Sequence, residues 1–219
     1  MNTDQSIDRV LLVNKPLEWT SFDVIRKSRY KLKIKKIGHA GTLDPLATGL
    51  LIICTGKMTK RIDEYQAQEK EYTGRFIIGQ STPSHDRETD VNETSDISHI
   101  TNENIIATTN QFMGAIDQVP PMHSAIKVDG KRAYELARRG ETAELKSRQV
   151  VISQFEITAI ELPSIGFRVV CTKGTYIRSL ARDFGKALGV GAYLAELCRT
   201  RIGTFRLEDA MQIEDIGGA

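Results

Sequence analysis

Short apolar runs, each ending at a turn-forming pair, mark the strands of this chain. Val10–Val13 is followed by Lys15-Pro16, as expected where a buried strand leaves a sheet. Leu50–Cys54 stops at Thr55-Gly56, and Tyr72–Ile78 is a further run rich in β-forming residues. We predict a β-strand at each of these runs.

Helical spacing and helix-capping residues predict helices elsewhere. A cap at Thr20 or Ser21 would begin a helix whose spacing places three apolar residues on one face: Phe22, Ile25 and Tyr30. Further helices are expected at Glu103–Phe112 and at Lys131–Arg139, the latter closed by Gly140.

The last predicted helix, Tyr176–Leu188, has two different faces and ends at Gly189. Its apolar face holds Ile177, Leu180, Ala181, Phe184 and Leu188. Its other side carries three basic residues at i, i+4 and i+8: Arg178, Arg182 and Lys186. The pattern indicates a helix that packs on a core.

The order of these elements favours one fold class. Val150–Leu162 and Phe167–Thr172 are β-rich runs close enough to form a hairpin, whereas Ser81–His99 is polar, acidic and aperiodic, which is typical of an exposed loop or short hairpin. Strands and helices do not alternate as a doubly wound parallel sheet requires. We predict an α+β fold, with a mixed, mainly antiparallel sheet flanked by helices, in a single domain over residues 1–219.

Composition excludes several classes of protein. The chain has 219 residues, 40% hydrophobic and 26% charged, which is ordinary for a globular protein. It has no uncharged run long enough to cross a bilayer and no apolar signal segment at its start. Its three cysteines are odd in number and far apart: Cys54, Cys171 and Cys198. Integral membrane, secreted and zinc-finger proteins are therefore excluded, and a cytoplasmic location is expected.

Charge is segregated along the chain although the net charge is only +2. Arg26–Lys36 holds seven basic residues and no acid, and Arg168–Arg206 holds eight basic residues against two acids. Such segments would form a polyanion-binding face if folding brings them together. For the lysine run alone, a solvated helix face is the favoured alternative. Nucleic acid becomes a candidate partner.

The common motifs of metal, nucleotide and serine-nucleophile sites are absent from the sequence. The four histidines are scattered without zinc spacing, and neither phosphate-binding glycine loop nor nucleophile elbow is present. A metal site and nucleotide-phosphate binding by such loops are therefore not expected.

The segment GHAGTLDPLATGLL, Gly38–Leu51, is the strongest candidate for chemistry. Glycines, threonines and a proline around Asp44 predict a tight irregular loop that leads directly into a strand. A carboxylate held on such a loop is well placed for nucleophilic or acid/base work. From spacing alone, a plain Asp44-Pro45 turn is the favoured alternative.

The same segment closely resembles the signature loop of the TruB family of tRNA pseudouridine synthases. Five further blocks resemble that family in the family's order: Val10–Ile25, Glu69–Thr82, Gly114–Gly140, Lys173–Gly185 and Gly191–Phe205. The resemblance covers most of the chain, and it implies the pseudouridine synthase catalytic fold.

The resemblance implies isomerisation of uridine 55 in the T arm of tRNA to pseudouridine, without metal or cofactor. By motif position, Asp44 is the nucleophilic aspartate; attack on the sugar, attack on the base ring and assistance of a glycal-like route all stay open. Arg178 matches the family's arginine partner of that carboxylate.

Other site residues are implied by motif position only. The buried base must be flipped out, and Tyr72 matches the tyrosine that stacks on it. Tyr176 matches a second tyrosine at the base, Leu197 an apolar contact to it, and His39 the histidine that fills the vacated space. Lys15 and Asp86 lie in matching motifs as structural or RNA-contact candidates. Each of these could instead be an ordinary core or helix residue.

The resemblance also implies a domain organisation and a partner. Residues 114–140 resemble an RNA-binding insertion, and we expect a short form without the C-terminal PUA domain that relatives often carry. The expected partner is the T-arm stem-loop of tRNA, bound by a monomer. The sequence departs from the family at His123, which replaces an aromatic residue, and in HDRETDVNE, which lacks a usual glycine. An RNA-binding or RNA-folding module without catalysis is the alternative function.

Overall fold

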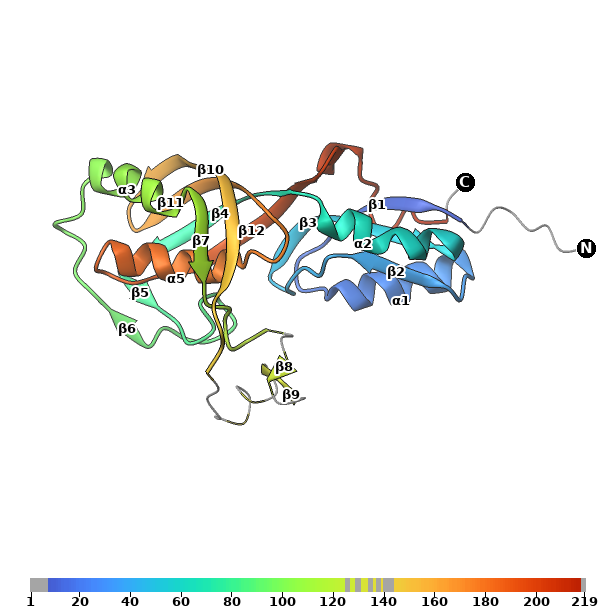
Figure 1. Ribbon diagram of the computed structural model, residues 1–219, viewed down its shortest axis with the longest axis horizontal. Coiled ribbons are helices and arrows are strands. Elements are labelled where there is room, and N and C mark those ends of the chain that lie inside the picture. Colours follow the sequence, from blue (N-terminus) through green and yellow to red (C-terminus); the bar gives the residue numbers. More distant parts are fainter. Residues whose placement is uncertain are drawn as a thin grey trace, which may run out of the picture. The chain divides into compact units, whose positions relative to one another are not determined.

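The computed structural model describes residues 8–124, 127–128, 131–133, 136, 139 and 144–217 (Figure 1). Its α-helices are α1 (Ser21–Leu32), α2 (Ile62–Ala67), α3 (Asn102–Thr109) and α5 (Ile177–Ala187). Its 3-10 helices are η1 (Gly56–Arg61), η2 (Asn110–Phe112) and η3 (Leu207–Asp209). Its strands are β1 (Val10–Lys15), β2 (Ile37–Ala40), β3 (Ala47–Thr55), β4 (Lys70–Ile78), β5 (Gln80–Ser81), β6 (Glu93–Thr94), β7 (Gly114–Gln118), β8 (Lys127–Val128), β9 (Lys131–Arg132), β10 (Arg148–Glu161), β11 (Ser164–Cys171), β12 (Ala192–Ile202) and β13 (Phe205–Arg206).

The described residues form two compact units. Unit 1 holds those within Met1–Thr73 and Leu197–Ala219, and unit 2 holds those within Gly74–Glu196. Strands β4 and β12 each contribute residues to both units.

Unit 1 is built around the buried strand β3. Strands β1 and β2 pair with β3 antiparallel, whereas β12 pairs with it parallel, from Leu197 opposite Ala47 to Arg199 opposite Gly49. Alternate β3 side chains enter two cores: one face packs with residues of α1, and the other packs with Tyr65 of α2. Because both faces are covered, β3 reads as a continuous apolar run.

Helix α1 begins where the sequence predicts, but it uses a different face. Thr20 caps it in a reciprocal capping box with Asp23. Of the three apolar residues with helical spacing only Ile25 is buried, while Phe22 and Tyr30 are 62% and 81% exposed. The packed face instead combines Val24 and Ile25 with two small residues, Ser21 and Ser28.

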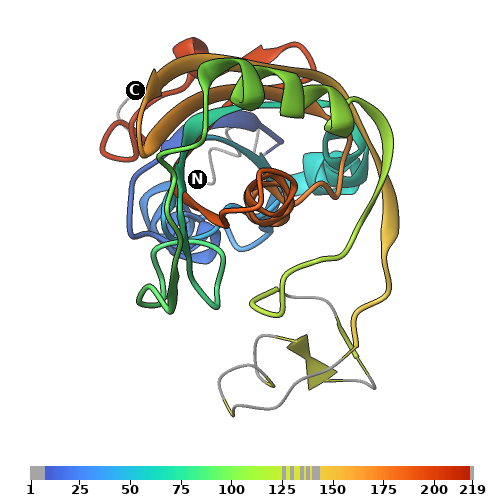
Figure 2. The same cartoon turned by 90° about the vertical axis from the view of Figure 1, so that its left-hand side faces the viewer.

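Unit 2 is a curved, mainly antiparallel sheet with α5 packed on it. Strands β4, β11, β10 and β7 lie side by side in that order, and β10 and β11 form the predicted hairpin. Figure 2 shows α5, viewed nearly along its axis, inside the curve of these strands. Phe184 of α5 packs against Phe76 and Phe155 with ring centroids 5.7 and 5.6 Å apart. The aromatic core fixes the helix against the sheet.

The remaining predictions are mostly confirmed. The three predicted strands, the hairpin within the polar segment (β5 with β6) and the α+β fold with a mixed sheet are all present. The Gly38–Gly49 loop is shorter than predicted, because its ends belong to β2 and β3. The predicted helix over Lys131–Arg139 is wrong at its start, since Lys131–Arg132 pair with Lys127–Val128 as β9 and β8. Of its other residues only 133, 136 and 139 lie within the described part, and Gly140 lies outside it.

No helix in the described part of the chain is long and apolar enough to span a membrane.

Candidate active site

Asp44 lies in the short loop that joins β2 to β3 in unit 1. Its carbonyl oxygen accepts from the Ala47 N–H at 3.1 Å, so Asp44-Pro45 does form a turn. Leu43, before it, is held by the Ser21 hydroxyl, which accepts from the Leu43 N–H at 2.9 Å and donates to the Leu43 carbonyl at 3.2 Å. The Asp44 residue itself is half-buried. The loop therefore presents a carboxylate on a backbone fixed from both sides.

Lys15 is a buried cation beneath this loop. Its ammonium donates to the carbonyl oxygens of Pro16, Trp19 and Pro45 at 2.9, 2.5 and 3.3 Å, and the side chain is fully buried. Burial lowers the pKa of Lys15 from 10.5 to about 8, while the nearby charge of Asp44 opposes that change and that of Arg199 adds to it. Lys15 thus anchors the residue after Asp44 and places positive charge near the carboxylate.

Arg199 of β12 ties the start of the loop to strand β3. Its Nε donates to the Leu50 carbonyl at 2.8 Å and its Nη2 to the Gly41 carbonyl at 3.0 Å, and the side chain is buried. Gly49 makes this approach possible, because a Cβ there would lie 2.4 Å from the Arg199 carbonyl oxygen. Sequence reasoning missed Arg199; the available signal was a charged residue two positions after Leu197, on the inward face of a strand.

His39 and Leu197 lie on strands that border the same loop. His39 is on β2, opposite Ile53 of β3, and its Nδ1 is buried without a hydrogen-bond partner among the described residues. Burial lowers the pKa of His39, and the charge of Arg199 adds to the effect, so both favour the neutral ring. Leu197 is half-buried on β12, opposite Ala47. The structure therefore places His39 and Leu197 on two of the three strands that pair with β3.

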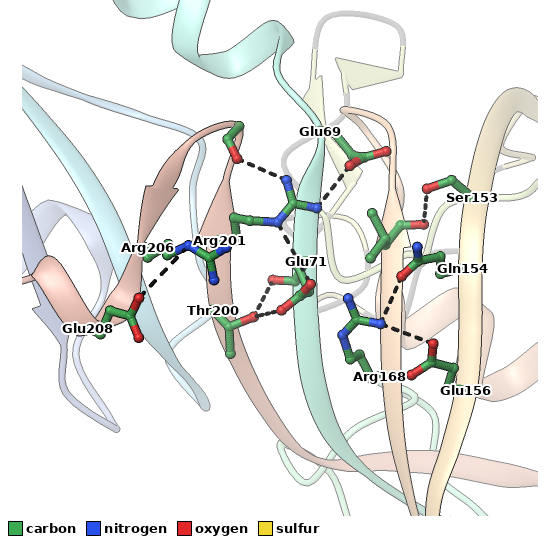
Figure 3. A network of polar contacts seen from close by, with 12 residues as sticks. Glu69, Glu71, Ser153, Gln154, Glu156, Arg168, Thr200, Arg201, Arg206 and Glu208 are labelled. Carbon is green, nitrogen blue, oxygen red and sulfur yellow. Dashed lines mark hydrogen bonds and ion pairs between the residues drawn. The ribbon is translucent and has the colours of Figure 1, made fainter.

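Tyr72 lies on β4 and is buried. Its neighbour Glu71 points to the other face of the strand, as alternation requires. There Glu71 accepts from Thr200 Oγ1 at 2.8 Å and faces Arg201, which also pairs with Glu69 at 2.9 Å (Figure 3). This network ties β4 to β12 and fixes the backbone that carries Tyr72.

Arg178 lies in the first turn of α5 in unit 2, and it is buried. Its Nε is 3.5 Å from a carboxylate oxygen of Asp86, which is also buried. Its Nη2 donates to the His123 carbonyl at 2.8 Å, and its Nη1 to the Ser84 carbonyl at 3.5 Å. Arg178 is therefore a buried cation held by specific contacts rather than an exposed charge on the helix. Its pairing with Asp44 stays a prediction.

Tyr176 is the residue that precedes α5 and caps its start. Its N–H donates to Gln118 Oε1 at 2.7 Å, and its carbonyl accepts from Gln118 Nε2 at 3.1 Å. The Arg148 guanidinium lies over the tyrosine ring, 4.5 Å from its centroid. A ring held in this way keeps a fixed place at the start of the helix that carries Arg178.

The described residues contain no group of three or more histidine, cysteine, aspartate or glutamate side chains that could hold a metal ion.

Comparison with known proteins connects these residues to a family. A family model described as the N-terminal domain of TruB family pseudouridylate synthase matches residues 29–177, and one described as the tRNA pseudouridylate synthase B C-terminal domain matches residues 178–219. The boundary between the two matched ranges falls within α5, between Ile177 and Arg178.

Relatives and solved structures agree with the family models. Proteins named tRNA pseudouridine synthase B from Flavobacterium johnsoniae and Parabacteroides distasonis are 57% and 56% identical to this chain. The alignments cover 94% of this chain and 93% and 91% of those proteins. A chain of a solved Cbf5–Nop10–Gar1 complex matches with a TM-score of 0.76 and 30% identity, over 97% of this chain and 54% of that one. The sequence resemblance is confirmed: this chain belongs to the TruB family of pseudouridylate synthases.

Proposed function

We propose that this chain is an isomerase that converts uridine 55 in the T arm of tRNA to pseudouridine. The observation that carries the proposal is the fixed loop around Asp44, held by two buried cations, Lys15 and Arg199, in a chain 57% identical to a tRNA pseudouridine synthase B. A protein that only binds RNA has no need of such a loop.

The reaction rearranges one nucleotide without net change of atoms. The bond from the ribose to N1 of uracil breaks, the base turns, and a bond from the ribose to C5 forms. C5 then loses its proton, and N1 gains one. Asp44 acts as the nucleophile that begins this exchange, and it is needed as a carboxylate. Lys15 places positive charge near that carboxylate in unit 1, and Arg178 is a further proposed cation.

The remaining residues prepare the base for Asp44. Flipping a base out of folded RNA requires a surface that replaces its lost stacking, worth about 1 to 3 kcal/mol per base. We assign this role to Tyr72, with Leu197 as an apolar contact and His39 in the space that the base leaves. We assign to Tyr176 the handling of the C5 proton after the new bond forms.

Recognition of the RNA rests on basic segments and on the insertion over residues 114–140. Exposed cations of the Arg26–Lys36 run are available to phosphates: Arg26, Lys27, Arg29, Lys33, Lys35 and Lys36. Of this insertion, residues 114–124, 127–128, 131–133, 136 and 139 lie within the described part of the chain. We propose that the chain acts in this way as a monomer in the cytoplasm.

Incubation with unmodified tRNA, followed by mapping of pseudouridine, tests the function. We expect conversion at a single uridine in the T arm without added metal or cofactor. Wild-type protein that binds the tRNA and converts no uridine would contradict the proposal and support an RNA-binding module instead.

A further inference from the structure

Unit 2 contains a cavity of about 510 Å³ that none of the residues assigned to the target uridine lines. It lies between the β5–β6 hairpin and the end of α5 with the turn that follows. The hairpin side contributes Ser81, Asn92 and Ser95, and the helix side contributes Arg182 and Lys186. Its size falls within the range of small-molecule sites.

Two glycines after α5 shape the wall of this cavity. Gly189 and Gly191 have φ of +78° and +73°, values that favour glycine. A Cβ on Gly191 would lie 2.4 Å from the Ser81 hydroxyl oxygen, so this glycine lets the hairpin approach the turn. The Gly191 carbonyl also accepts from the Gly79 N–H at 3.0 Å. The wall is therefore held by specific contacts.

The basic row on α5 ends in a cation at this cavity. The first member, Arg178, is buried and paired with Asp86, and the second, Arg182, is 27% exposed and bonded to Asp183 at 2.8 and 3.1 Å. The third, Lys186, is exposed and makes no hydrogen bond or ion pair with the described residues. Among the described lining residues, Glu93 is the one acid, and it too is exposed. Lys186 therefore supplies positive charge that no neighbour has neutralised.

His85 gives the same cavity a flat, uncharged surface. Its φ is +61°, an uncommon conformation for a residue with a side chain, and it is held by a hydrogen bond from its N–H to Thr82 and one from Leu194 to its carbonyl. Burial lowers the pKa of His85 to about 4, with the charges of Arg182 and Arg178 adding to the effect. A neutral imidazole can stack on a base, and the Asn92 amide and Ser95 hydroxyl can bond to base edges.

We propose that this cavity binds a phosphate-bearing nucleotide, with the phosphate at Lys186 and the base against His85 and Asn92. The expected source is a nucleotide of the RNA substrate other than the one isomerised, and in that form the inference rests on the proposed function. A free mononucleotide has the same chemistry, and the experiment separates the two sources.

The first arm measures the Kd for unmodified tRNA between 50 and 200 mM salt for the wild type and three variants. Lys186→Gln should weaken binding about two- to fivefold and reduce the slope of log Kd against log salt by about 0.7 to 0.9, the contribution of one phosphate contact. Lys186→Arg is the matched control, and it should restore the slope because it keeps the charge. Glu93→Gln should tighten binding because it removes the acid from the cavity.

The second arm titrates uridine 5′-monophosphate into the protein and follows backbone amides by NMR. The expected result for a bound mononucleotide is a set of chemical-shift changes confined to the amides of Gly189, Gly191 and Ser95 and lost in Lys186→Gln. If these changes occur while Lys186→Gln leaves the salt dependence of tRNA binding unchanged, the site belongs to a free nucleotide. Unchanged slopes together with unshifted amides would overturn the proposal. Both arms measure binding and neither requires conversion of uridine. A failure of this proposal can therefore be told apart from a failure of the proposed isomerase activity.

Discussion

Arg199 donates from Nη2 to the carbonyl oxygen of Gly41 across 3.0 Å, three residues before Asp44. Its Nε donates to the Leu50 carbonyl of β3, so one guanidinium ties the start of the loop to the strand that follows it. Arg199 is therefore a positioning residue: it acts on Asp44 through the backbone. The site depends on a strand far away in sequence as much as on the loop itself.

Replacing Arg199 should separate loop geometry from RNA binding. Arg199→Gln leaves the buried Leu50 carbonyl and the half-buried Gly41 carbonyl without this partner, at about 1 to 3 kcal/mol each, and should lower the free energy of unfolding by about 2 to 6 kcal/mol. The single-turnover rate at saturating tRNA should fall at least tenfold, by analogy with a misplaced reacting group, with little change in tRNA affinity. Arg199→Lys keeps the charge but cannot bridge both carbonyls. A folded Arg199→Lys protein with the wild-type rate would contradict the positioning role.

Gly49 should tolerate no side chain, because β3 and β12 meet there. Its φ is +103°, and a Cβ would lie 2.4 Å from the Arg199 carbonyl oxygen. Gly49→Ala should lower the free energy of unfolding by about 3 to 5 kcal/mol, measured by urea denaturation. Gly189→Ala is the matched control: its φ is also positive, but no atom lies within 4 Å of its Cβ position, so it should lose only about 1 to 2 kcal/mol. Equal losses in the two variants would contradict the close packing at Gly49.

Lys15 should make stability rise with pH above neutrality. Its pKa is about 8 in the folded protein and 10.5 when exposed, so between these values the unfolded chain binds more protons than the folded chain. The full gain in stability is reached only above pH 10.5, where Lys15 has lost its proton in both the folded and the unfolded chain. Relative to Lys15→Met, the wild type should gain roughly 1 to 3 kcal/mol between pH 7.5 and pH 10. A difference that stays constant over this range would show that Lys15 is not a buried ammonium.

His85 should destabilise the protein on acidification. Its pKa is about 4 when folded against 6.5 when exposed, so the unfolded state binds more protons between these values and stability falls as pH drops from 6.5 to 4. His85→Asn suits the positive φ and removes the titration. Between pH 7 and pH 4 the wild type should lose roughly 1 to 3 kcal/mol more than the variant, as measured by thermal or urea unfolding. Parallel losses would contradict a buried neutral imidazole.

The sequence predicts local elements well because their signals are local. The run Leu50–Cys54 and the cap at Thr20 suffice to place β3 and the start of α1. Phe22 and Tyr30 mislead because which face of a helix is buried depends on its neighbours, and Lys131–Arg132 form a strand because β8 is present to pair with them.

The sequence likewise predicts only part of the candidate site. Asp44 stands out by its loop, and family motifs supply Tyr72, Tyr176, Arg178, Leu197 and His39. The burial of Arg178 and the carbonyl contacts of Lys15 and Arg199 arise from tertiary packing, which no local pattern records. The cavity at Lys186 joins segments about a hundred residues apart, so only the fold brings it together.

The most direct test of the central claim is the amount of pseudouridine formed at position 55 of an unmodified tRNA by Asp44→Asn. The substitution keeps the shape of the side chain and removes the nucleophilic charge. We expect tRNA affinity close to that of the wild type and no conversion, while the wild type converts the same tRNA fully. Multiple turnovers by Asp44→Asn protein that mass spectrometry shows to be free of deamidated aspartate would contradict the account.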